Sequence, residues 1–170
     1  MREKIERLSI RARVAFIILC LEKSVENSSK PSKWQKVLDV FWLQTNIQFV
    51  DEWLYNISKV MPESILDDAY EENDTLSYND YVELDFLYKT VPKYIFELME
   101  LAFECGTIEL YGAIENKSER TIELVLKAIE TMKQNDIVLP NIDLLKKFTI
   151  TENSGWGRQF TREDIFNEPV

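Results

Sequence analysis

The sequence predicts an all-α fold, a single irregular bundle of roughly six to eight helices over residues 1–170. The 170 residues are enough for one ordinary domain, and 45% of them are hydrophobic. Apolar residues recur three and four positions apart along nearly the whole chain, as they do on the buried face of a helix. Only four glycines are present, the first at position 106, so tight β-hairpins and phosphate-binding glycine loops are not expected before that point.

The first half of the chain carries four predicted helical segments, each marked by an apolar face with helical spacing. They run from Ile5 to Leu19, from Trp34 to Phe41, from Ile47 to Met61 and from Pro62 to Ala69. Ser32 and Gln35 have the spacing of a capping box at the start of the second segment. The fourth opens on a proline, a residue favoured in the first turn of a helix. The sequence leaves open whether the second and third segments are continuous.

Four further helical segments are predicted in the second half of the chain. They cover residues 77–88, 92–106, 118–132 and 141–148. Ser77 with Asp80 forms a capping-box pattern at the start of the first of these, and Gly106 suits the end of the second. Residues 149–160 are expected to form a loop. Thr161 with Asp164 predicts a last short helical turn.

The composition excludes several classes of function. The formal net charge is −10 and histidine is absent, which excludes His-based triads, His general bases and His zinc sites. An acidic chain is also poorly suited to binding nucleic acid, because phosphates require Lys and Arg. Cys20 and Cys105 lie far apart in apolar patterns, which indicates buried, reduced thiols.

The amino-terminal apolar run does not predict a membrane segment. Residues 14–21 are too few to span a bilayer, and no small-residue cleavage site of a signal peptide follows them. We therefore expect a cytoplasmic protein without membrane contact.

The acidity is concentrated in the middle of the chain. Residues 1–50 hold nine Lys and Arg against five Asp and Glu, a net charge of +4. Residues 51–115 hold three against sixteen, a net charge of −13, and residues 116–170 hold eight against nine, a net charge of −1. The densest part lies between residues 67 and 85, where Tyr70, Tyr78 and Tyr81 are interleaved with the carboxylates.

Three interpretations of this acidic segment compete. It could be a solvated face, partly neutralised by Arg7 and Arg11 of the protein's own basic first helix. It could bind a metal ion, although it has neither the glycine nor the spacing of a calcium loop. It could also bind a basic partner, because clustered carboxylates speed encounter with a cationic protein and tyrosines supply contact area. In the last case we expect the surface to be built on Asp67, Asp68, Tyr70, Glu71, Glu72, Asp74, Asp80, Tyr81 and Glu83.

The most distinctive local motif is Gly155-Trp156-Gly157, followed by Phe160. Glycine on both sides of one Trp indicates unusual backbone angles or a close approach that anchors the indole. We expect residues 149–170 to form a tail that this motif packs onto the bundle, although a direct role in partner binding is an alternative. A catalytic role is disfavoured because no activating base lies near Ser154.

A small, acidic, histidine-free, helical chain that ends in Gly-Trp-Gly-x-x-Phe resembles the all-α immunity proteins of bacterial polymorphic toxin and contact-dependent inhibition systems. The resemblance would cover most of the chain. It implies a cytoplasmic, non-enzymatic protein that binds one cognate toxin domain, often a basic nuclease, and blocks its active site or an essential surface. It implies no catalytic residue, no metal and no cofactor.

Two other functions would use the same acidic residues. A nucleic-acid mimic or regulator would occupy the groove of a DNA-binding protein, which requires carboxylates with phosphate-like spacing over a long face. A metal-dependent helical enzyme would require a deep pocket lined by carboxylates and tyrosines. The basic first third could also meet the acidic middle across a homodimer, and composition does not decide between these arrangements.

Overall fold

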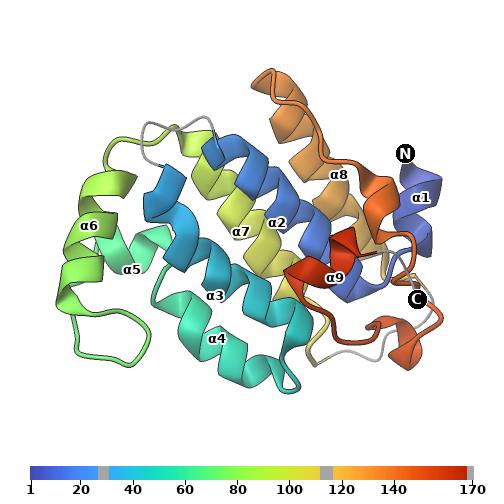
Figure 1. Ribbon diagram of the computed structural model, residues 1–170, viewed down its shortest axis with the longest axis horizontal. Coiled ribbons are helices and arrows are strands. Elements are labelled where there is room, and N and C mark those ends of the chain that lie inside the picture. Colours follow the sequence, from blue (N-terminus) through green and yellow to red (C-terminus); the bar gives the residue numbers. More distant parts are fainter. Residues whose placement is uncertain (27–30, 112–116, 168–170) are drawn as a thin grey trace.

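The structure is a bundle of α-helices around one central helix (Figure 1), as the sequence predicts. The computed structural model describes residues 1–26, 31–111 and 117–167. Within these ranges no β-strand is formed, and one isolated antiparallel bridge joins Leu8 to Thr149. Six α-helices have nine residues or more: α2 Ile10–Glu26, α3 Gln35–Asn46, α4 Val50–Ser58, α6 Tyr78–Tyr88, α7 Lys93–Thr107 and α8 Glu119–Gln134. Shorter elements are α1 Arg2–Arg7, α5 Pro62–Leu66, α9 Arg162–Phe166 and the 3₁₀ turns η1 Pro31–Trp34, η2 Ile142–Leu145 and η3 Asn153–Gly155.

Helix α2 forms the centre of the core. It packs against α3, α7 and α8, and the side chains from Ile10 to Glu22 are all buried. A helix that is buried on every side needs apolar residues all round rather than on one stripe. The run from Val14 to Leu21 therefore belongs to a core helix. None of the helices in the described ranges is both long and apolar enough to cross a membrane.

The predicted first helix is interrupted, which corrects the continuous helix expected from Ile5 to Leu19. Leu8 has extended backbone angles and ends α1, and α2 begins at Ile10. The carboxy-terminal segment supplies the competing hydrogen bonds. Ser9 N donates to Phe148 O at 3.0 Å, and Ile150 N donates to Arg7 O at 3.0 Å. The apolar periodicity of residues 5–19 gives no sign of this break, because the break is imposed by residues 148–150, which are distant in sequence.

Two predicted helix signals are wrong in position. Ser32 and Gln35 do not form a capping box, because η1 precedes α3 and its N-cap is Trp34, without a side-chain cap. Gly106 does not end α7, which continues to Thr107. A Cβ atom at Gly106 would lie 2.9 Å from the Trp53 ring, so this glycine allows close packing against that indole.

The helix that opens at Pro62 is shorter than predicted. It ends at Leu66, and residues 67–77, which we call the acidic loop, connect it to α6. The expected inward position of Ala69 is therefore wrong, and this side chain is exposed. Helical geometry would place Asp67 beside Glu71 and Asp68 beside Glu72, and like charges at this spacing destabilise a helix. The other boundary signals hold, since Ser77 with Asp80 and Thr161 with Asp164 form complete capping boxes.

Candidate partner-binding surface

The acidic loop lies at the end of the bundle formed by α5 and α6, away from α1 and the N-terminus (Figure 1). Five of the predicted site residues lie in this loop with exposed side chains: Asp67, Asp68, Glu71, Glu72 and Asp74. Among the described residues, none of the five forms an ion pair. The structure therefore gathers five uncompensated carboxylates on one short segment.

The loop is held in one conformation by its own polar groups. Asn73 Oδ1 accepts hydrogen bonds from the backbone amides of Thr75 at 3.0 Å and Leu76 at 2.8 Å. Thr75 Oγ1 donates to Asn56 Oδ1 of α4 at 2.8 Å. The side chain of Leu76 is buried and fastens the loop to the core. Bonds of this kind replace the missing helical hydrogen bonds and fix the backbone that carries the carboxylates.

The three tyrosines that the sequence interleaves with the carboxylates form one cluster. The ring of Tyr70 lies 5.4 Å from that of Tyr78, edge to face, and 5.4 Å from that of Tyr81. Tyr70 OH donates to Leu76 O at 3.1 Å, and Tyr81 OH donates to Asp68 O at 2.8 Å. Two hydroxyls are thus used to hold the loop, while the aromatic surface lies beside the acidic groups.

The carboxylates of α6 differ from those of the loop because they are ion-paired. Asp80 pairs with Lys36, Glu83 pairs with Lys33, and Asp85 pairs with Lys89 at 2.7 Å. Asp80 also accepts from Ser77 N at 3.0 Å in the capping box. The hydrogen bond from Lys36 and those from Ser77 hold the pKa of Asp80 below its ordinary value. Asp80 and Glu83, both predicted site residues, therefore fasten α6 to the segment that precedes and begins α3.

The basic first helix does not neutralise the acidic segment, contrary to one interpretation of the sequence. Arg11 is buried and donates to the carbonyls of Gln44 and Ile47 at the end of α3. Arg13 is fully buried, and burial lowers the pKa of its guanidinium to about 10. Both cations therefore act inside the core, and the carboxylates of α6 are compensated by Lys33, Lys36 and Lys89 instead.

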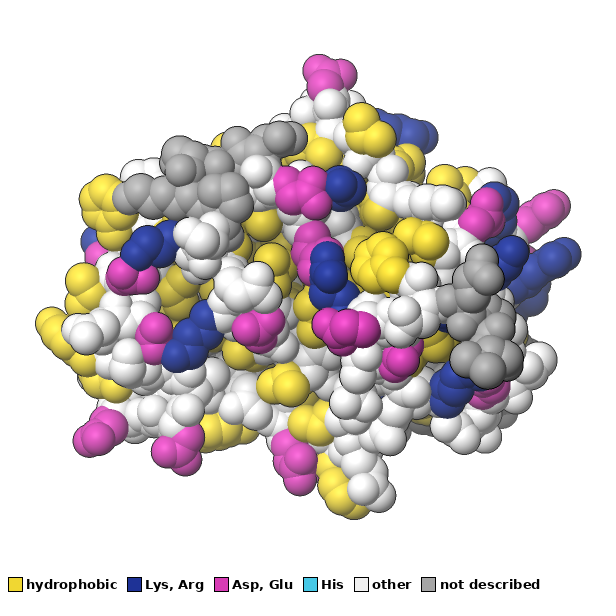
Figure 2. Space-filling model, in the orientation of Figure 1, with side chains coloured by type: hydrophobic (Ala, Val, Ile, Leu, Met, Phe, Trp, Pro, Cys, Tyr) yellow, Lys and Arg dark blue, Asp and Glu magenta, His cyan; other side chains and the backbone are white. Residues whose placement is uncertain are grey.

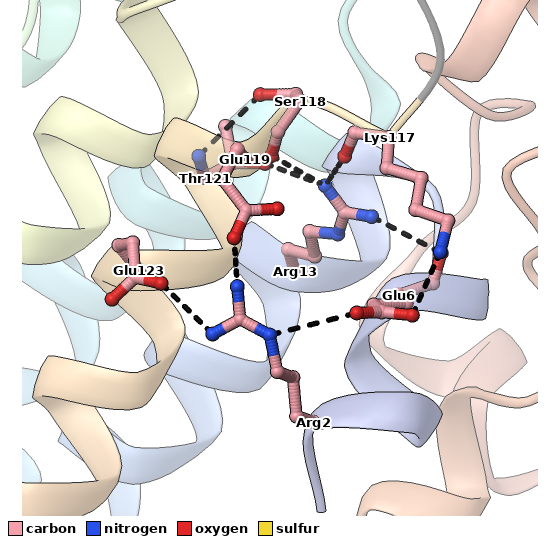
Figure 3. A network of polar contacts seen from close by, with 8 residues as sticks. All are labelled: Arg2, Glu6, Arg13, Lys117, Ser118, Glu119, Thr121 and Glu123. Carbon is pink, nitrogen blue, oxygen red and sulfur yellow. Dashed lines mark hydrogen bonds and ion pairs between the residues drawn. The ribbon is translucent and has the colours of Figure 1, made fainter.

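Arg13 lies at the centre of a polar network that joins α1, α2 and α8 (Figure 3). Its guanidinium donates to Thr121 Oγ1 at 2.7 Å, to Ser118 O at 3.2 Å and to Ile5 O at 3.2 Å. Around it, Arg2 pairs with three carboxylates and Lys117 pairs with Glu6 at 2.8 Å. The hydrogen bond from Lys117 lowers the pKa of Glu6. These charged groups pair with one another within the chain, and they lie at the end of the molecule opposite the acidic loop.

The Gly-Trp-Gly motif contacts the start of α2. Gly155 and Gly157 have φ angles of +95° and +86°, the left-handed region that favours glycine. Trp156 O accepts from Arg11 N at 3.1 Å, while its side chain is only partly buried. The Phe160 ring is buried and stacks on Phe148 with 3.8 Å between ring centroids. Two glycines and Phe160 thus hold the tail on the bundle, and the indole contributes less to this contact than the sequence suggests.

Several pockets lie on the described surface, and some of them are lined by predicted site residues. One of about 310 Å³ is lined by Asp68, Tyr70, Glu71 and Tyr81, beside Lys59 and Asn73. Both tyrosine hydroxyls donate to backbone carbonyls of the loop, to Leu76 O and to Asp68 O. In the described residues, no three Cys, Asp or Glu side chains are placed to hold a metal ion.

Another pocket, of about 500 Å³, lies between α2, α3 and α9. At its edge the carboxylate of Glu22 accepts from Trp42 Nε1 at 2.8 Å and from Arg162 Nε at 2.7 Å. The bond to Glu22 raises the pKa of Arg162. Sequence reasoning missed this trio, because nothing in the local pattern links residues so distant in the chain.

Sequence reasoning also missed the outward face of α6. Tyr78, Val82 and Phe86 are spaced four residues apart and are exposed. The signal was present in the sequence, because residues 78–88 carry apolar side chains on both faces of the helix. We call these three residues the outer stripe of α6.

Comparison with known proteins identified no relative. No protein-family model matches the chain, and no curated protein and no solved structure is significantly similar to it.

Proposed function

We propose that this chain is a non-catalytic immunity protein of the cytoplasm that binds and neutralises a basic toxin domain. The observation that carries the proposal is the set of five exposed carboxylates on the acidic loop, none of which is ion-paired within the described residues. Uncompensated charge of one sign adds repulsion to a folded chain and is useful chiefly when a partner supplies the opposite sign.

The fixed backbone of the acidic loop favours a role in partner binding over a role in solubility alone. Its backbone is fixed by Asn73 and by the hydroxyls of Tyr70 and Tyr81. A pre-ordered surface loses little conformational entropy when a partner docks. Solubility alone would be served equally well by mobile charges distributed over the molecule.

The localisation of the charge favours a compact interface over nucleic-acid mimicry. The acidic loop concentrates five unpaired carboxylates within residues 67–74, whereas a mimic of DNA requires negative charge along an extended face. The face shown in Figure 2 carries Lys and Arg side chains among its Asp and Glu side chains.

The test is binding of the toxin domain encoded by the reading frame beside this gene. We expect Asp68→Lys, Glu71→Lys and Glu72→Lys together to lower the association rate constant at low salt by about tenfold or more. The salt dependence of that rate should weaken as well, because steering by these charges is screened by ions. The same variant should lose protection of cells that produce the toxin domain.

A matched control reverses three exposed carboxylates on α7, Glu97, Glu100 and Glu104, which changes the net charge equally. This control should retain most of the association rate. An unchanged rate in the loop variant would remove the acidic loop from the mechanism. Absence of binding by the unmodified chain, together with displacement of DNA from a general DNA-binding protein, would replace the proposal with nucleic-acid mimicry.

A further inference from the structure

Helix α6 has two apolar faces, and only one of them is buried. Its inner face contributes Leu84, Leu87 and Tyr88 to the core. The outer stripe remains exposed, with 61% of Tyr78, 46% of Val82 and 59% of Phe86 accessible. Figure 2 shows hydrophobic side chains along the edge of the molecule where Figure 1 places α6.

The stripe differs from the isolated apolar side chains that every protein surface carries. Positions four residues apart lie above one another on a helix, so the three side chains form one continuous strip. A helix that packs on one side normally has polar residues on the other. Contiguous exposed apolar surface with a polar border is typical of a protein–protein interface.

The surroundings of the stripe are acidic. At its amino-terminal end, Tyr78 lines a recess of about 590 Å³ together with Tyr70, Glu72 and Asp74. Lys36 also lines this recess, where its ammonium group pairs with Asp80. Glu72 and Asp74 are not ion-paired within the described ranges. Such a recess suits a Lys or Arg side chain, which the carboxylates attract and which the tyrosine rings can also contact through their faces.

We propose that the outer stripe of α6 is the apolar centre of the interface, and that its occupant is a basic partner protein presenting an apolar patch bordered by Lys or Arg. This inference rests on the proposed function and adds the part of the surface that determines how long the complex lasts. Apolar anchors near the middle of an interface mainly set the dissociation rate, whereas peripheral charges mainly set the association rate.

Charge argues against a second copy of this chain as the occupant. A twofold-symmetric contact places the same patch of both copies together. Two stripes facing each other would bring together two surfaces of the same net sign, because the unpaired carboxylates of Glu72 and Asp74 border the stripe in both copies. The repulsion would oppose the apolar contact, while a basic partner would strengthen it.

The first experiment uses a synthetic amphipathic helix of about 18 residues, with Leu on one face and Lys on the other, as the probe. We expect it to shift the NMR amide signals of residues 67–88 in the full chain. Replacing Tyr78, Val82 and Phe86 together with Ala should weaken its binding about tenfold. A milder variant, Val82→Ser with Phe86→Ser, leaves the Tyr70–Tyr78 contact intact and should give the same direction of change.

The matched control replaces the same residue types at exposed positions elsewhere, namely Phe49, Tyr55 and Val138, with Ala. This variant should bind the probe as the unmodified chain does. Three outcomes would each overturn the inference. The probe could shift signals only outside residues 67–88, or it could bind the stripe variants as tightly as the unmodified chain. A probe with Glu in place of Lys could also bind as tightly as the Lys probe. The inference would also be overturned if the free chain formed a dimer and the stripe variants abolished it, because the occupant would then be a second copy.

The toxin domain used above separates this inference from the proposed function. With that partner, the stripe variants should dissociate about tenfold faster while their association rate stays within about twofold. Unchanged dissociation would overturn the inference and leave the immunity function standing. Absence of toxin binding by the unmodified chain would overturn the proposed function, whereas the probe experiment would still test the stripe.

Discussion

Gly157 combines an unusual backbone angle with a close contact. Its φ of +86° lies in the left-handed region, and a Cβ atom built there would lie 2.3 Å from Ser9 Oγ. Ser9 is also the residue whose amide bonds to Phe148, at the break between α1 and α2. The glycine therefore lets the tail approach the start of α2 at the point where the tail interrupts the first helix.

Replacing Gly157 with Ala should lower the free energy of unfolding by about 2 kcal/mol, because the substitution adds both backbone strain and a clash. Urea denaturation followed by circular dichroism measures the change. In a Ser9→Gly background the clash is removed, so the same substitution should cost only about 1 kcal/mol. Equal losses in the two backgrounds would show that Ser9 does not restrict this position.

Helix α6 depends on its amino-terminal cap. Ser77 and Asp80 form reciprocal hydrogen bonds there, and Lys36 pairs with the same carboxylate. The cap fixes where the acidic loop ends and the helix begins, and so it sets the direction in which the outer stripe faces. The bonds from Lys36 and Ser77 favour the ionised form of Asp80 and lower its pKa.

The stability supplied by Asp80 should be lost in acid. The folded-state pKa of Asp80 lies below its ordinary value of 3.8, so its contribution is complete above that pH and declines as the pH falls through the folded-state pKa. Asp80→Asn should therefore be less stable than the unmodified chain at about pH 6, and the difference should shrink towards about pH 3. Unfolding free energies across this range measure the effect. A difference that stays constant with pH would exclude ionisation of Asp80 as its cause.

The charges of the whole molecule are divided between the interior and the surface. Two arginines of α2 bond to carbonyl groups in the core, Lys33 and Lys36 compensate α6, and the acidic loop lacks ion pairs in the described part of the chain. The net charge of −10 therefore understates the local potential at the loop, because several cations are unavailable to it.

Arg13 should be essential for joining the helices. Arg13→Met removes the buried hydrogen bonds that join α2 to the carbonyls of α1 and the start of α8 and to Thr121 Oγ1, which should cost about 3 kcal/mol or more. Arg7→Met, at an exposed position, should change stability by less than about 0.5 kcal/mol. Thermal unfolding of both variants tests the contrast, and similar losses in the two would contradict the assignment of Arg13 as the central donor.

Much of the candidate site could be predicted from the sequence because it lies within one continuous segment. The carboxylates and tyrosines between residues 67 and 81 are neighbours along the chain, so their clustering needed no tertiary information. Which of these carboxylates form ion pairs, however, depends on the tertiary structure. Asp80 and Glu83 resemble the loop carboxylates in sequence, yet only these two meet Lys36 and Lys33, which approach from a distant segment.

By itself the sequence determined the all-α class, the starts of most helices and the place where the acidity gathers. Periodicity, capping residues and composition are local properties, and local interactions suffice to express them. Only the tertiary structure decided that the first helix breaks at Leu8, that Arg11 and Arg13 lie in the core, and which carboxylates remain unpaired. The reason is physical: the partners in each case, Phe148, Gln44, Ser118 and Lys36, lie far along the chain, and folding alone brings them into contact.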